Sequence, residues 1–182
     1  VEVNGRLVAS YGLGAGFDVE FTGRENIILN GLILGMEYRE ILERIDAIAS
    51  LADLGPFMEH PNKTYSSGMR SRLGFAVAAN VEPDVLILDE VLAVGDAVYK
   101  QTALQKMYEL RDSGTTILFV SHSMETVKEF CTEAILLHEG RVLEFGESTE
   151  VVDRYEALVS EAREQKRRQR ADGDLSSDIA AP

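Results

Sequence analysis

The segment YSSGMRSRLGFAVAANVEPDVLILDEVLAVGD, residues 65–96, carries the clearest signals of fold and site in this chain. Its apolar run VLIL, residues 85–88, is of the kind found in the buried strands of parallel sheets. Asp89 and Glu90 follow at once, and the carboxyl ends of parallel strands are where α/β proteins bind their ligands. Adjacent carboxylates there suit a Mg²⁺ ion and an attacking water. Taken alone, the pair fits equally well a strand end that caps the next segment.

A second apolar run ends in a similar way. The segment TTILFVSH, residues 115–122, is typical of another buried strand, and His122 is its last residue. If the two strands are parallel neighbours, His122 should lie near Glu90. A histidine there can bond a phosphate oxygen and the attacking water. A lone histidine after a strand is more often structural, and we interpret His60 and His138 in that way.

The start of the helix expected at residues 67–81 is a candidate phosphate site. Helix N-termini present unpaired N–H groups and the positive end of the helix dipole. The hydroxyls of Ser66 and Ser67 add donors, and Gly68 permits close approach of the backbone. An ordinary serine cap explains the same residues and is the commoner feature.

The remaining elements alternate in the second half of the chain, which predicts an α/β fold with a parallel sheet. Helices are expected at 24–35, 38–55, 67–81, 96–114, 124–133 and 148–168, and strands at 1–10, 84–90, 115–122, 134–140 and 141–147. The helical stretch from about 24 to 82 interrupts the alternation, so we interpret it as an inserted helical subdomain. Thr22, with Glu25 at capping-box spacing, is expected to begin it.

Composition limits the classes of partner. The 182 residues include 18 Lys and Arg against 31 Asp and Glu, a net charge of −13. This acidity argues against nucleic acid as a partner, because such binding depends on neutralising phosphates with basic side chains. Cys131 is the only cysteine, so no internal disulfide can form, which fits a reducing cytosol. The most apolar run, residues 27–36, is about half the roughly 20 residues that a membrane span needs. Any function at a membrane is therefore expected to require a partner protein.

The glycine-rich segment YGLGAGF, residues 11–17, resembles part of a dinucleotide-binding fingerprint. Its third glycine would have to fall at position 17, which is Phe17. We therefore interpret the segment as a structural loop.

Taken in order along the chain, the stronger signals resemble the ABC ATPase family. YSSGM is similar to the signature motif usually written LSGGQ, and Arg70 and Arg72 resemble the basic residues after it. VLILDE resembles the Walker B strand, VLAVGD the D-loop and SH the switch histidine, while TGREN is similar to the segment that opens the helical subdomain. Within the family, the forms YSSGM and VGD look like those of ATPases that export O-antigen, capsule, teichoic acid and galactan. The resemblance covers about residues 1–155.

This resemblance implies a role for the residues at the strand ends. Glu90 would be the general base, Asp89 the carboxylate that holds Mg²⁺, and His122 the sensor of the γ-phosphate of ATP. The expected fold is a P-loop NTPase-like parallel sheet with an inserted helical subdomain.

The resemblance also implies an assembly. Ser66, Ser67 and Gly68 would contact the ATP held by the other subunit of a homodimer, and Asp96 would couple the two sites. A membrane-spanning permease would be the partner, a lipid-linked polysaccharide the transported substrate, and the cytoplasmic face of the cell membrane the location.

One family motif is missing. No G-x-x-x-x-G-K-[ST] loop, the Walker A motif that cradles phosphates, occurs in the chain, and no residue fits the usual glutamine of the Q-loop. We expect an N-terminal truncation, with a degenerate protein as the alternative.

If the chain is truncated, residues 1–160 are a partial nucleotide-binding domain, and residues 161–182 are a basic helix end followed by a disordered tail. A solvated helix end explains the basic stretch better than a membrane-surface role does.

Two rival classes stay open at this point. One is a soluble ABC protein acting on ribosomes or DNA, although the acidic chain shows neither two cassettes nor a long coiled coil. The other is a non-catalytic ABC-like interaction module, which the missing Walker A motif allows. An intact Lys-containing loop in the upstream sequence would remove the interaction module. A neighbouring gene with six apolar spans would favour export over the ribosomal class.

Overall fold

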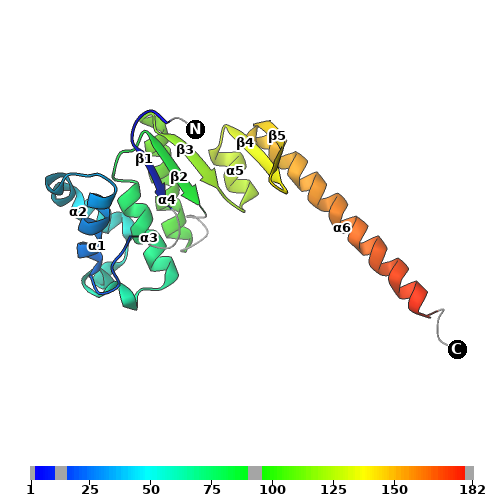
Figure 1. Cartoon of the computed structure of the whole chain (residues 1–182), viewed down its shortest axis with the longest axis horizontal. Helices are drawn as coiled ribbons and strands as arrows, with labels where there is room; N and C mark the ends of the chain where they lie inside the picture. The colour runs from blue at the N-terminus through cyan, green and yellow to red at the C-terminus, as the bar shows by residue number, and fades with distance from the viewer. Residues whose placement is uncertain (1–2, 11–15, 90–95, 179–182) are drawn as a thin grey trace. The chain divides into compact units, whose positions relative to one another are not determined.

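The computed structural model of the protein describes residues 3–10, 16–89 and 96–178 (Figure 1). The chain divides into two compact units, Val1–His122 and Ser123–Pro182. The first unit contains a parallel sheet and a group of helices. The second contains a hairpin and two helices.

The sheet of the first unit is parallel, as the alternation of strands and helices predicts. Its strands lie in the order β1 (Leu7–Ser10), β2 (Val85–Asp89) and β3 (Thr116–Val120). Both strand pairs are parallel. Helix α4 (Ala97–Asp112) connects β2 to β3, as parallel neighbours require. The prediction of adjacent parallel strands at 84–90 and 115–122 is therefore confirmed.

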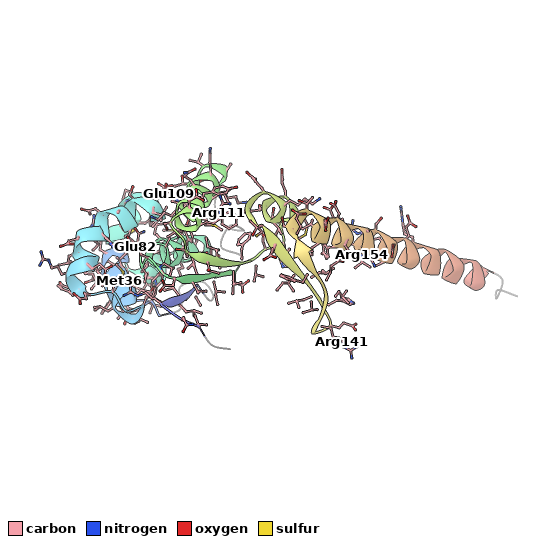
Figure 2. The ribbon with its side chains drawn as sticks, turned by 90° about the horizontal axis from the view of Figure 1, so that it is seen from above. Met36, Glu82, Glu109, Arg111, Arg141 and Arg154 are labelled. Carbon is pink, nitrogen blue, oxygen red and sulfur yellow. The ribbon has the colours of Figure 1, made fainter. Side chains whose placement is uncertain are left out.

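The two faces of this sheet differ in burial. One face is closed, and its buried side chains are Val8, Leu86 and Leu88. Figure 2 shows α4, marked by Glu109 and Arg111, along one side of the sheet. The other face is open, and its exposed side chains are Leu7, Leu118 and Val120. Asp89 pairs with Val120 and so belongs to the open face.

The inserted helical subdomain is confirmed as a group of helices. It consists of α1 (Gly23–Ile33), α2 (Tyr38–Ala52), two short 3₁₀ turns (Gly55–Glu59 and Asn62–Thr64) and α3 (Ser67–Ala78). Figure 1 shows α1, α2 and α3 grouped beside the sheet. Helix α2 ends earlier than expected, at Ala52, because Asp53 adopts the left-handed conformation at φ 49° and caps it.

The beginning of α1 follows the predicted capping box. The N–H of Glu25 donates to Oγ1 of Thr22 at 3.2 Å, and the N–H of Thr22 donates to the Glu25 carboxylate at 2.8 Å. Asn26, fully buried, also bonds the preceding loop. Its amide nitrogen donates to the main-chain oxygens of Asp18 and Phe21, and its Oδ1 accepts from the N–H of Asp18. A fully satisfied buried amide therefore fixes the entry to this helix.

The second unit is built around a hairpin. Its elements are α5 (Met124–Phe130), the antiparallel strands β4 (Glu133–His138) and β5 (Arg141–Glu147), and α6 (Ser148–Asp178). Figure 2 marks the hairpin by Arg141 and α6 by Arg154. Val151 and Val152 are buried at the start of α6, and Lys128 of α5 forms ion pairs with Asp153 and Glu156.

Helix α6 corrects one expectation. The helix was expected to end at about residue 168 and to be followed by a disordered tail, yet it continues to Asp178. No proline occurs between Asp84 and Ala181, and extending a helix that has already formed costs much less than starting one. Residues 179–182 lie outside the described part of the chain.

Candidate functional site

Two of the predicted site residues lie at the carboxyl edge of the parallel sheet. Asp89 ends β2 and pairs with Val120, the last residue of β3. His122 lies two residues beyond Val120, so both side chains belong to the same edge. Both residues are exposed. Glu90, the predicted base, lies outside the described residues.

The environment of Asp89 suits a metal ion held jointly by the protein and a bound ligand better than a metal ion enclosed by protein side chains. No group of three or more His, Cys, Asp or Glu side chains able to hold a metal ion occurs in the described parts of the chain. Mg²⁺ commonly takes one or two protein carboxylates and completes its coordination with water and substrate phosphates. An exposed carboxylate at the end of β2 fits that arrangement, because its outward side is open to a phosphate-bearing ligand.

The start of α3 is the second part of the predicted site. Ser66 has extended backbone angles, and its Oγ accepts a hydrogen bond from the N–H of Met69 at 3.2 Å. The predicted serine cap is therefore present. Ser66 and Ser67 are exposed, and Gly68 is partly exposed. The first turn of a helix has N–H groups without partners inside the helix, so this end can also receive an anion from outside.

The predicted site residues thus fall into two sets on different elements. Asp89 and His122 end strands of the sheet, whereas Ser66, Ser67 and Gly68 begin a helix of the helical subdomain. The first set suits a metal and a phosphate, and the second suits a phosphate alone.

Asp96 caps the helix that follows β2. Its Oδ1 accepts a hydrogen bond from the N–H of Tyr99 at 2.9 Å, and its side chain is exposed. The N–H of Tyr99 lowers the pKa of the Asp96 carboxyl, and the N–H of Val98 and the positive charge of Arg72 act in the same direction. Asp96 is therefore held as a carboxylate at the start of α4.

Tyr99 is a residue that the sequence alone did not single out. Its side chain is buried, and the guanidinium carbon of Arg72 lies 4.2 Å from the centre of its ring. Burial raises the pKa of Tyr99, so its phenol stays protonated and can donate a hydrogen bond. The signal available in the sequence was an aromatic residue three positions after a capping Asp. That pattern does not distinguish a tyrosine that stacks on an arginine from one that simply packs in the core.

Comparisons with known proteins agree on one family. Residues 8–93 match the family model described as ABC transporter. The teichoic acids export ATP-binding protein TagH of Bacillus anthracis is 43% identical over 172 residues, covering 94% of this chain and 31% of the relative. The O-antigen export system ATP-binding protein RfbB of Myxococcus xanthus is 45% identical over 165 residues, covering 91% of this chain and 38% of the relative. The chain thus spans about a third of the length of these two relatives.

The fold also has a known counterpart. A dimeric ATP-binding cassette, MJ0796, solved in a post-hydrolysis state bound to ADP and Pi, superposes with a TM-score of 0.67 at 20% identity. The match covers 79% of this chain and 63% of that protein. Among the helices of the described residues, none has both the length and the apolar character that a membrane span requires. The chain thus matches the ABC transporter family over residues 8–93, and the relatives it resembles over most of its length are ATP-binding proteins of export systems.

Proposed function

We propose that this chain is part of the ATP-hydrolysing subunit of an ABC transporter that exports lipid-linked cell-surface polysaccharide. The observation that carries the proposal is the register of β2 and β3, which brings Asp89 and His122 to one sheet edge. The names of the relatives, teichoic acids export and O-antigen export, support the transported class.

At this edge each candidate residue has a distinct task. The Asp89 carboxylate would hold Mg²⁺, which when bound neutralises charge on the phosphate oxygens. The Glu90 carboxylate would accept a proton from the attacking water. The imidazole of His122 would donate a hydrogen bond to an oxygen of the γ-phosphate. Water attack on the γ-phosphate of ATP would then release ADP and phosphate.

The start of α3 would act on a second nucleotide. Ser66, Ser67 and Gly68 would contact the γ-phosphate of the ATP held by the other subunit of a homodimer, while Asp96 would couple the two sites. The dimeric state of MJ0796 is consistent with such an arrangement. The 182 residues contain no G-x-x-x-x-G-K-[ST] sequence, so the proposal requires this loop elsewhere in the full-length polypeptide.

The partner would be a membrane-spanning permease, and the subunit would work at the cytoplasmic face of the cell membrane. ATP hydrolysis would drive the lipid-linked glycan through that permease. The glycan would therefore not need to contact this chain directly.

The test combines an ATPase assay with a transport assay. The purified full-length polypeptide should hydrolyse ATP in the presence of Mg²⁺ and lose this activity with EDTA. Deletion of its gene should leave lipid-linked glycan inside the cell, and wild-type protein, unlike Glu90→Gln, should restore export. A full-length polypeptide without a phosphate-binding loop, or normal glycan export after deletion, would contradict the proposal.

A further inference from the structure

Arg72 of α3 is bound to the end of α2 by three contacts. Its Nε donates to the main-chain oxygen of Ala52 at 3.0 Å, and its Nη2 donates to the main-chain oxygen of Asp53 at 2.6 Å. The same Nη2 lies 2.6 Å from Oδ2 of Asp53. The side chain of Arg72 is only 13% exposed. Largely desolvated contacts of a guanidinium hold one orientation more firmly than exposed ones.

The opposite side of this guanidinium meets α4. Its central carbon lies 4.2 Å from the centre of the Tyr99 ring, and Tyr99 as a whole is 1% exposed. The Tyr99 hydroxyl donates back to the main-chain oxygen of Arg72 at 3.5 Å, the outer limit of a hydrogen bond. Arg72 and Tyr99 therefore contact each other through both the stacked side chains and the main chain, across two helices.

Both helices begin at a candidate site residue. Arg72 lies six residues after Ser66, the cap of α3, and Tyr99 lies three residues after Asp96, the cap of α4. The Tyr99 N–H also donates to the Asp96 carboxylate at 2.9 Å. A continuous series of contacts thus runs from the first turns of α3 through Arg72 and Tyr99 to Asp96.

We propose that Arg72 is a positioning residue that, through Tyr99, keeps the start of α3 and the Asp96 cap of α4 in a fixed spatial relation. This inference rests on the proposed function, because it concerns how Ser66–Gly68 and Asp96 act together across a dimer. When the partner's nucleotide contacts Ser66–Gly68, α3 and the start of α4 move as one body. Asp96 then reaches its coupling position in the same step.

A lysine cannot take this role. It would keep the charge at position 72 but would lose the planar fork that bonds Ala52 and Asp53 while stacking on Tyr99. Tyr99→Phe keeps the stacked ring and loses only a long hydrogen bond, whereas Tyr99→Leu loses the ring. Arg111→Lys is the matched control. Arg111 also stacks on a tyrosine, Tyr108, at 4.7 Å, but both of those residues belong to α4.

The first measurement is a distance that does not depend on ATP hydrolysis. Spin labels at Ser67→Cys and Val98→Cys, in full-length polypeptide with Cys131 and any other native cysteine changed to Ser, report the separation of the two helix starts. Arg72→Lys and Tyr99→Leu should broaden the distance distribution, whereas Tyr99→Phe and Arg111→Lys should leave it unchanged. An unchanged distribution in both Arg72→Lys and Tyr99→Leu would overturn the inference.

The second measurement is steady-state ATPase kinetics of the unlabelled full-length variants. Arg72→Lys and Tyr99→Leu should lower kcat about tenfold or more with little change in the KM for ATP, because nucleotide capture by the subunit's own loop stays intact. The two control variants should stay within about twofold of wild type. Unchanged kcat in Arg72→Lys and Tyr99→Leu would overturn the inference, and so would kcat losses matched by equal losses of folded protein in melting curves.

The two failures are distinguishable. A wild-type protein that does not hydrolyse ATP contradicts the proposed function and with it the positioning role. An active wild type with a normal distance distribution and normal kcat in Arg72→Lys contradicts the positioning role alone.

Discussion

The guanidinium of Arg72 lies between the last carbonyl groups of α2 and the ring of Tyr99, 4.2 Å from the ring centre. One largely buried side chain of α3 therefore contacts two other helices of the first unit, α2 and α4. Removing it would leave the main-chain oxygens of Ala52 and Asp53 without these hydrogen bonds, and would leave one face of a buried aromatic ring without its partner.

The pair should show a measurable coupling free energy. In a double-mutant cycle of Arg72→Met and Tyr99→Leu, the two losses of unfolding free energy should be non-additive by about 1–2 kcal/mol, the usual range for a desolvated cation–π contact. Urea unfolding of the four proteins measures it. The same cycle at Arg111 and Tyr108, where Arg111 is 40% exposed, should give a smaller coupling because solvent weakens the interaction. Additive losses at Arg72 and Tyr99 would contradict the prediction.

The charge of Asp96 should contribute stability that depends on pH. The pKa of its carboxyl is lowered from the ordinary 3.8, chiefly by the N–H of Tyr99. A lowered pKa in the folded state means that the contribution is fully present above the unfolded-state pKa and is lost as pH falls through the folded-state pKa. Asp96→Asn keeps the cap but removes the charge, so it should be less stable than wild type at neutral pH.

This difference should shrink below pH 3.8 and vanish below the folded-state pKa of Asp96. Melting curves of both proteins from pH 7 to pH 2.5 measure the difference directly, since other carboxyl groups titrate in both. Equal stability of the two proteins at neutral pH would show that the charge contributes nothing.

Gly31 of α1 lies where this helix packs against α2, and it should be hard to replace. A Cβ there would lie 2.9 Å from both Cγ1 and Cδ1 of Ile41, so either the buried Ile41 side chain or one of the two helices has to shift. Gly31→Ala should therefore cost about 1–3 kcal/mol of unfolding free energy. Gly74→Ala in α3 is the matched control. Its Cβ would have no neighbour closer than Phe17 at 4.0 Å, so it should gain about 0.5–1 kcal/mol from helix propensity. Urea unfolding that ranks the two variants the other way would contradict this packing argument.

The parts of the fold that follow local rules were predictable from the sequence. The runs at 85–88 and 115–122 predicted two strands, and the Thr22–Glu25 spacing predicted a capping box. Both follow from patterns within a few residues. The second strand was also expected to be buried, and this was wrong, because the residues of β3 alternate between exposed and half-buried. Parallel pairing then placed Asp89 and His122 at one edge, because parallel strands end on the same side of a sheet.

Other features depend on packing that no local pattern records. Arg72 and Tyr99 are 27 residues apart, and their contact depends on how α3 and α4 cross. The end of α2 at Ala52, three residues before the expected Gly55, depends on the left-handed Asp53 that caps it. The length of α6 was also missed, because the composition of residues 172–178 is unlike that of a helix even though no residue stops it.

Glu90→Gln should separate nucleotide binding from hydrolysis in the full-length polypeptide. An amide cannot accept the proton of the attacking water, whereas Asp89 can still hold the metal. ATP binding should be retained, turnover should be lost, and ATP-dependent dimers should accumulate in size-exclusion chromatography. Glu161→Gln, an exposed acid on α6, is the control and should hydrolyse ATP at the wild-type rate. Rapid hydrolysis by Glu90→Gln would remove this residue from the role of base.

A variant at the start of α3 should fail only across the dimer. Gly68 follows Ser67, the first residue of the helix, and both Ser66 and Ser67 are exposed, so Gly68→Asp should fold normally. A carboxylate there repels the γ-phosphate of the partner's nucleotide and occupies the space for its approach. The isolated monomer should still bind ATP through its own phosphate-binding loop, yet the homodimer should not hydrolyse it.

Mixing two inactive variants distinguishes action across the dimer from action within one subunit. In a heterodimer of Gly68→Asp with a subunit whose phosphate-binding Lys is replaced, one composite site carries both lesions and the other carries neither. Some ATPase activity should therefore return on mixing, although each variant alone stays inactive, because the intact site can turn over with both of its halves unaltered. If Gly68→Asp instead abolishes ATP binding by the monomer, this glycine serves the site of its own subunit. Activity would then stay absent in the mixture, since no composite site could combine two functional halves.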